Sequence, residues 1–175
     1  MSDRVSPNGS TALPLIIGLG NEHRSDDRSG LEVVRALRGR LEGRARIEEC
    51  VAGGVALLDR WRAADRVIVV DAVRSGARPG TVHRLEPSDG EMGILRGPTS
   101  THGLSLAEAV ALAKGLGQLP SHLVVYGIEA ANVKVGDELT PEVARGVEEA
   151  TARILAEVAT PFASRGPGPT ERAHA

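Results

Sequence analysis

Residues 67–70, Val-Ile-Val-Val, constrain the fold of this chain more than any other feature of its sequence. Four β-branched residues in a row favour extended backbone, because branched side chains pack well on a pleated sheet. An apolar run with no polar alternation is typical of a strand that is covered on both faces. Residues 66–71 therefore predict a buried strand, with helices on both sides of its sheet. The strand ends in a carboxylate, Asp71.

Strand and helix patterns alternate along the rest of the chain. Apolar runs predict further strands at residues 14–20, 46–50, 81–85 and 122–128. Apolar residues at helical spacing predict helices at 31–41 and 54–60, a third from Ser105 and a fourth after Thr140. This alternation predicts a three-layer α/β fold, in which a twisted, mostly parallel or mixed sheet of about five or six strands carries helices on both faces.

The last two predicted helices have clear start signals. Ser105 and Glu108 match a capping box, in which each side chain bonds the backbone of the other residue. Their helix is expected to turn four residues inward: Leu106, Val110, Ala113 and Leu116. Thr140 followed by Pro141 predicts an N-cap and a proline at the first helical position.

The chain of 175 residues fits a single domain. Residues 14–160 carry all the predicted elements and are expected to form that domain. Residues 1–13 and 161–175 are rich in small polar residues, glycine and proline. Such segments bury too little apolar surface to offset the entropy of ordering, so both ends are predicted to be disordered.

Composition excludes several classes of function. A net charge of −2 and an aromatic content of 2% argue against a nucleic-acid surface, which needs basic and stacking side chains. Cys50 is the single cysteine, so neither an internal disulfide nor a zinc site with several cysteines can form. The polar N-terminal segment lacks a signal-peptide core, and no apolar run reaches the roughly 18 residues of a membrane span. We expect a cytoplasmic protein that contacts no membrane.

Three polar residues fall where strands deliver them to one edge of the sheet. Asp27 follows the first strand, Asp71 ends the most hydrophobic one, and His102 lies in the long loop before Ser105. In open α/β sheets the functional crevice lies beyond the carboxyl ends of the strands. Two carboxylates and one imidazole are suitable ligands for a divalent first-row metal, and three protein ligands leave coordination positions open. The sequence therefore predicts a metal-binding site at this edge of the sheet.

Each of these residues also has a simpler interpretation. Asp26 and Asp27 could stabilise the dipole of the following helix, and His102 could be an ordinary loop histidine. Asp71 is harder to explain in this way, because a carboxylate after four apolar residues is costly to bury without a partner. His23 is a minor candidate near the same edge, and Cys50 is expected to be a small buried residue.

The turn Gly18-Leu19-Gly20 resembles half of a dinucleotide-binding motif. The third glycine of that motif would stand at position 23, which is His23, and a polar stretch separates the turn from the next helix. The glycines are therefore expected to permit a tight bend rather than to bind a nucleotide.

In combination, these segments resemble the endopeptidases that mature the large subunit of nickel–iron hydrogenases. The matching pieces, in order, are Gly18-Leu19-Gly20-Asn21, Asp26-Asp27 with Gly30, the strand ending in Asp71-Ala72, Pro79-Gly80, Ser100-Thr101-His102, Gly127-Ile128-Glu129 and Leu139-Thr140-Pro141-Glu142-Val143. Each piece is weak alone, and the specificity lies in their order and spacing across residues 15–158.

The resemblance implies a twisted mixed sheet between helices, and an enzyme that cuts a C-terminal extension from the hydrogenase large-subunit precursor after nickel insertion. It implies that Asp27, Asp71 and His102 recognise the nickel ion by coordinating it. The metal would arrive on the substrate rather than serve as a resident cofactor. For the cut itself, either the metal polarises the scissile carbonyl or a carboxylate, Asp27 or Asp71, activates water. Neither the oligomeric state nor the particular hydrogenase follows from the sequence.

Two departures from the family pattern bear on the site. Arg28 stands where a glycine commonly follows the acidic pair, so the turn there must form without glycine's freedom. Glu49 is the acidic residue nearest to a segment where relatives carry Asp-Gly-Gly, and its role stays open. A peptidyl-tRNA hydrolase also begins with a Gly-Leu-Gly-Asn turn, and a non-enzymatic nucleotide-binding module is a further alternative. The basic surface that a tRNA enzyme needs is missing from the composition.

Overall fold

A computed structural model describes residues 13–51, 54–62, 64–87, 105–136 and 138–160. Within them, five strands form one sheet in the order β2-β1-β3-β5-β4. The strands are β1 (Leu15–Leu19), β2 (Arg46–Cys50), β3 (Arg66–Val73), β4 (Val82–Leu85) and β5 (His122–Glu129). All neighbours are parallel except β4, which runs antiparallel to β5 at the edge. The predicted disordered ends lie outside the described residues, apart from Leu13.

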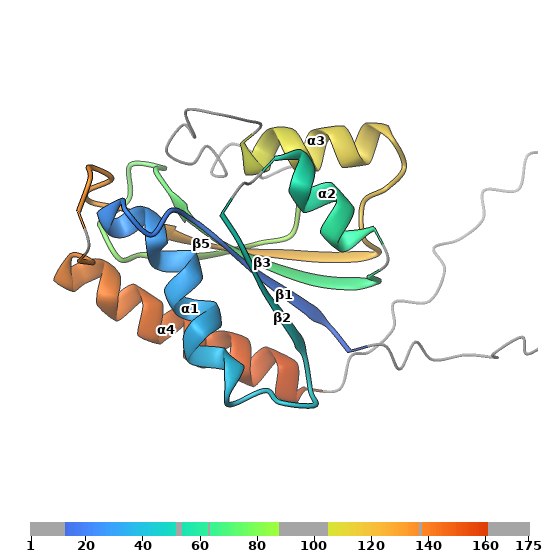
Figure 1. Cartoon of the computed structure of the whole chain (residues 1–175), viewed down its shortest axis with the longest axis horizontal. Helices are drawn as coiled ribbons and strands as arrows, with labels where there is room; N and C mark the ends of the chain where they lie inside the picture. Colours follow the sequence, from blue (N-terminus) through green and yellow to red (C-terminus); the bar gives the residue numbers. More distant parts are fainter. Residues whose placement is uncertain (1–12, 52–53, 63, 88–104, 137, 161–175) are drawn as a thin grey trace, which may run out of the picture.

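Helices cover both faces of the sheet, as predicted. Helices α1 (Ser29–Arg38) and α4 (Pro141–Ala159) pack on one face, and α2 (Val55–Trp61) and α3 (Leu106–Gly115) lie on the other (Figure 1). One turn of 3-10 helix, η1 (Ser25–Arg28), leads into α1. No helix in the described parts of the chain is long and apolar enough to cross a bilayer.

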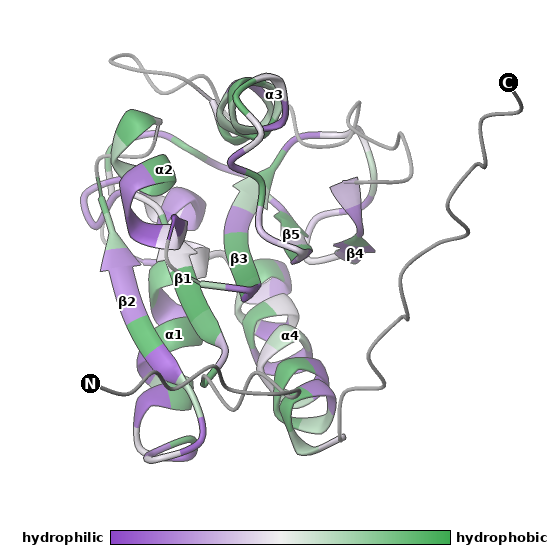
Figure 2. Ribbon diagram, turned by 90° about the vertical axis from the view of Figure 1, so that its right-hand side faces the viewer, coloured by the Kyte–Doolittle hydropathy of each residue, from purple (hydrophilic) through white to green (hydrophobic). Residues whose placement is uncertain are grey.

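The β-branched run of β3 lies at the centre of two apolar layers. Val67 and Val69 pack in the layer under α2 and α3, while Ile68 and Val70 pack in the layer under α1 and α4. All four side chains are fully buried. Because successive side chains of a strand point to opposite faces, a strand between two helical layers must be apolar at every position. Figure 2 shows hydrophobic colour over most of β1 and β3.

The end of one strand and the burial of one residue differ from the sequence prediction. Strand β3 does not end at Asp71 but continues to Val73, because Ala72 and Val73 pair with the last residues of β5. Leu116, predicted to point inward, is 56% exposed. It stands at the C-cap, just beyond the last residue of α3, and so leaves the buried stripe.

The helix starts are confirmed in position, and one differs in chemistry. Ser105 and Glu108 form the predicted capping box at α3. Thr140 is the N-cap residue of α4 and Pro141 follows it, yet the Thr140 side chain makes no capping bond to the helix. Its hydroxyl instead donates to the carboxylate of Asp26, at 3.0 Å from Oδ1. This bond joins the start of α4 to the loop after β1.

Candidate active site

The first turn of α1 rests directly on the backbone of two strands. A Cβ atom at Gly30 would lie 2.3 Å from the carbonyl oxygen of Leu19 in β1 and 2.4 Å from that of Val70 in β3. Contacts this short exclude any side chain, so only glycine lets the helix approach both strands. The approach holds η1, and with it Asp27, over the carboxyl end of the sheet.

Gly20 supports the same loop from β1. Its φ is +147°, and a Cβ atom there would lie 2.2 Å from the carbonyl oxygen of Asp27. A side chain is therefore excluded by space and disfavoured by conformation. The chain's own loop occupies the space above this glycine. The predicted tight bend is confirmed, and the turn is explained by packing within the protein.

Asp71 lies in β3, just past the last residue of that strand that pairs with β1. The pairing of these strands stops at Gly18 and Val70, one residue before Asp71. From β1 the chain crosses to β2 on one side, whereas β3 lies on the other side. Such a switch in strand order opens a crevice at the carboxyl ends of the strands. Asp27 lies beside it, since η1 contacts β3.

The electrostatics of the two carboxyl groups show that they are close. Burial, followed by the negative charge of Asp27, raises the pKa of Asp71 to about 8, although the backbone N–H of Ala72 donates to the carboxylate at 2.9 Å. Burial also raises the pKa of Asp27, partly offset by the positive charge of Arg24. The metal-free pair therefore retains a proton near neutral pH.

A pair of this kind can act in two ways. A divalent cation would replace this proton and relieve the repulsion between the carboxylates. A carboxylate with a raised pKa could also accept a proton from water as a general base. Among the described residues no group of three or more His, Cys, Asp or Glu side chains is arranged to hold a metal ion. The third predicted ligand, His102, lies outside the described residues.

Asp26 has a role that the sequence did not reveal. The residue is fully buried, and its carboxylate accepts hydrogen bonds from the backbone N–H groups of Ala131, Asn132 and Thr140 at 2.7–2.9 Å. The hydroxyl of Thr140 is a fourth donor. Asp26 therefore does not serve the dipole of α1 from the surface. Its partners lie more than a hundred residues away, so no local pattern could have identified them.

The Arg28 departure is accommodated without strain. Its φ and ψ are −79° and −4°, in the right-handed helical region that any residue adopts. The guanidinium pairs with Glu32 one turn along, at 2.7 Å. The turn that presents Asp27 therefore requires no glycine at position 28.

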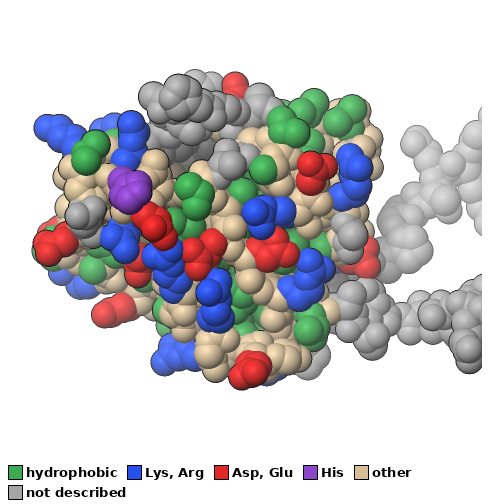
Figure 3. All heavy atoms as spheres, viewed as in Figure 1, with side chains coloured by type: hydrophobic (Ala, Val, Ile, Leu, Met, Phe, Trp, Pro, Cys, Tyr) green, Lys and Arg blue, Asp and Glu red, His purple; other side chains and the backbone are tan. Residues whose placement is uncertain are grey.

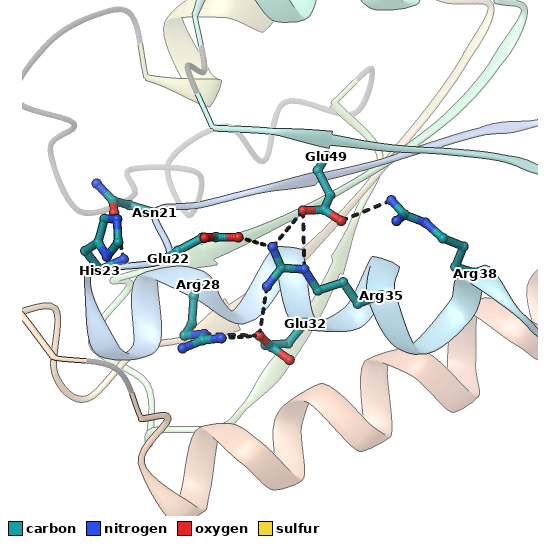
Figure 4. A network of polar contacts seen from close by, with 8 residues as sticks. All are labelled: Asn21, Glu22, His23, Arg28, Glu32, Arg35, Arg38 and Glu49. Carbon is teal, nitrogen blue, oxygen red and sulfur yellow. Dashed lines mark hydrogen bonds and ion pairs between the residues drawn. The ribbon is translucent and has the colours of Figure 1, made fainter.

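Glu49 belongs to an ion-pair network on the outer side of β2 and α1. Arg35 lies at its centre and contacts Glu22, Glu32 and Glu49, while Arg38 also binds Glu49 (Figure 4). The hydrogen bond from Arg35 is the main cause that lowers the pKa of Glu49, so this carboxylate is charged and engaged. Acidic and basic side chains are interspersed over the face shown in Figure 3. Glu49 contributes to this network and not to a metal-binding group of described residues.

The described histidines do not extend the site. His23 is exposed, and its backbone N–H bonds the side chain of Asn21. His83 lies 3.5 Å from Glu129, which anchors the turn after β3. Cys50 is buried and free, as expected for a small core residue.

Comparison with known proteins identifies the family. A sequence model described as hydrogenase maturation protease matches residues 31–157, which is well over half of the chain. The chain belongs to the hydrogenase maturation protease family. Membership confirms the resemblance of the motifs and the expected class of enzyme, a peptidase, and decides against the two alternatives. The matched residues include Asp71 and begin just after Asp27.

Curated relatives agree with this assignment. The hydrogenase expression/formation protein HupD of Thiocapsa roseopersicina is 31% identical over 144 residues, covering 81% of this chain and 65% of that protein. This chain therefore spans slightly less than two thirds of that relative. The hydrogenase 2 maturation protease of Escherichia coli is 28% identical over 145 residues, covering 81% of this chain and 88% of the relative.

Solved structures confirm the fold. The hydrogenase maturating endopeptidase HybD from E. coli superposes with a TM-score of 0.72 at 27% identity, covering 84% of this chain and 92% of that one. The solution structure of an endopeptidase from E. coli gives a TM-score of 0.70 at 26% identity, covering 83% and 91%. The α/β architecture of this protein is thus that of the maturation proteases.

Proposed function

We propose that this protein removes the C-terminal extension of a nickel–iron hydrogenase large-subunit precursor, in the cytoplasm, after nickel has been inserted. Asp27, Asp71 and His102 recognise nickel that the precursor carries. The metal is then part of the substrate and not a resident cofactor. The observation that carries the proposal is the pairing of Asp27 with Asp71 at the switch point between β1 and β3. Family membership supplies the class of reaction.

The pair of carboxylates is suited to recognising the nickel ion of the substrate. In the metal-free enzyme one proton reduces the repulsion between Asp27 and Asp71, and a nickel ion presented by the substrate would replace it. Nickel lies above iron in the order of divalent metal affinities, so oxygen and imidazole ligands favour a nickel-loaded precursor over an unloaded one. Binding becomes tight only once the metal is in place. Proteolysis thereby acts as a checkpoint on assembly.

Hydrolysis of the peptide bond requires an activated water or an activated carbonyl. Nickel in the substrate could polarise the scissile carbonyl as a Lewis acid. In the other route Asp71 or Asp27 takes a proton from the attacking water and passes it to the leaving amine. We favour Asp71 for this second role, acting in its ionised form, because the negative charge of the neighbouring Asp27 raises its affinity for a proton.

The decisive experiment uses a nickel-loaded large-subunit precursor that still bears its extension. It is incubated with the wild type and with Asp27→Asn, Asp71→Asn and His102→Ala, and shortening is followed by mass spectrometry. We expect the wild type to shorten only the loaded precursor and all three variants to leave it intact. Asp59→Asn is a matched control, because that carboxylate is 71% exposed on α2.

The outcomes separate the parts of the proposal. Equal cutting of a nickel-free precursor would refute the checkpoint, while full activity of Asp71→Asn would refute the assigned site. Circular dichroism and thermal unfolding must show that each inactive variant is folded. An inactive Asp59→Asn would mean that the loss reflects general damage to the protein.

A further inference from the structure

The carboxylate of Asp26 joins two loops at the carboxyl end of the sheet. Oδ2 accepts from the N–H of Ala131 at 2.9 Å and of Asn132 at 2.7 Å, and Oδ1 accepts from the N–H of Thr140 at 2.8 Å. The side chain is fully buried, so it cannot touch a substrate. Hydrogen bonds to an ionised acceptor are among the strong ones. Asp26 therefore fastens the segment after β1 to the segment between β5 and α4.

Backbone bonds extend this junction on either side of Asp26. The N–H of Asp26 donates to the carbonyl of Asn132 at 2.9 Å, and that of Ser25 donates to Gly136 at 2.7 Å. In return the N–H of Gly136 donates to the carbonyl of His23 at 3.1 Å. Backbone hydrogen bonds thus join the segment after β1 to the segment between β5 and α4. Asp27 is the first residue beyond this junction.

We propose that Asp26 is a positioning residue, whose buried carboxylate holds Asp27 in place beside Asp71 for recognition of the nickel-loaded substrate. This inference rests on the proposed function of the Asp27–Asp71 pair. For both carboxylates to reach one metal ion, the loop that bears Asp27 must stay next to β3, which η1 contacts. Gly20 supports the backbone of Asp27 from below. The Asp26 junction fixes it from the side.

The sharpest test removes one bond of the junction and nothing else. The hydroxyl of Thr140 donates to Asp26 and makes no capping bond to α4. Thr140→Val deletes this donor at nearly unchanged shape, while Thr140→Ser retains it. We expect Thr140→Val to lower kcat/KM for the nickel-loaded precursor about fivefold, the effect of one net hydrogen bond, and Thr140→Ser to restore it.

A second pair of variants tests Asp26 directly. In Asp26→Asn either orientation of the amide sets its NH₂ against at least one backbone N–H. We expect a loss of about a hundredfold in kcat/KM, the scale of a misplaced catalytic group. Glu157→Gln is the matched control, because Glu157 also accepts several hydrogen bonds, from Tyr126 and Arg84, but lies near the opposite end of α4. The kcat/KM of Glu157→Gln should stay within about twofold of the wild-type value, as expected for an independent site.

All rates are measured at a temperature where circular dichroism shows every variant to be fully folded. A merely structural Asp26 would then leave the activity of the folded enzyme unchanged, as in Glu157→Gln. If Thr140→Val and Thr140→Ser have the same kcat/KM while Asp27→Asn is inactive, the positioning role is refuted and the proposed function stands. If Asp27→Asn is itself fully active, the proposed function fails, and the inference fails with it. Should Asp26→Asn not fold, the two Thr140 variants decide the question alone.

Discussion

Replacing Asp71 with asparagine should make the metal-free protein more stable at neutral pH while removing its proposed activity. The reason is that the folded state holds this carboxyl group with a pKa of about 8, whereas the unfolded chain holds it near the ordinary 3.8. Between these values the unfolded chain releases the proton and the folded protein keeps it. Each pH unit in that interval therefore favours unfolding by about 1.4 kcal/mol.

The destabilisation by Asp71 depends on pH through these two pKa values. Below pH 4 both states are protonated, and Asp71 contributes no penalty relative to asparagine. The penalty grows as pH rises, reaches at most about 4 kcal/mol at pH 7, and levels off above the folded pKa. In a domain of this size about 1 kcal/mol shifts Tm by roughly 2–4 °C. We expect Asp71→Asn to melt at least about 5 °C above the wild type at pH 7 and within about 1 °C at pH 4.

The assay is thermal unfolding in a chelating buffer from pH 4 to pH 9, followed by circular dichroism. Asp59→Asn serves as the control, since an exposed carboxylate should give a difference in Tm that does not depend on pH. The asparagine at position 71 can still accept the bond from Ala72. A constant difference across the pH range, or an Asp71→Asn protein less stable than the wild type at pH 8, would refute the reasoning.

Three further predictions concern stability, each checked by urea unfolding as a shift in midpoint at unchanged slope. Gly30→Ala should lose about 3 kcal/mol or more, because its Cβ would collide with two strand carbonyls, while Gly39→Ala, with open space around it, should change little. Tyr126→Phe should cost about 1–2 kcal/mol, since the buried hydroxyl donates to Glu157 at 2.6 Å. Arg35→Met should cost about 1 kcal/mol or less, and the loss should shrink at 1 M salt, because the network is partly exposed.

The strands and helices could be predicted because their signals are local. The run at residues 67–70 predicted a strand with two covered faces, and the structure places its side chains alternately in the two apolar layers. The proximity of Asp27 and Asp71 could also be predicted, because parallel strands deliver their carboxyl ends to one edge. The end of β3 could not be predicted from the sequence, because pairing with β5 extends this strand two residues past the polar Asp71.

Other features depend on partners that sequence proximity cannot show. Asp26 and Asp27 are neighbours of the same type, yet one is a buried acceptor for a distant loop and the other acts on Asp71 through its charge. Thr140 has the residue type of an N-cap but gives its hydroxyl to Asp26. Arg28 departed from the family pattern and proved compatible with the turn. In each case tertiary contacts decided between local options of similar energy.

The bond between Asp26 and Thr140 joins residues that lie 114 positions apart. Forming such a contact requires closure of a long intervening stretch of chain, which costs conformational entropy. On a ribosome, the loop carrying Asp27 therefore cannot gain this lateral support until Thr140 has emerged. A fragment that lacks the start of α4 could still pair β1 with β3, but it would hold Asp27 loosely. Completion of the fold is thus coupled to the readiness of the peptidase to act.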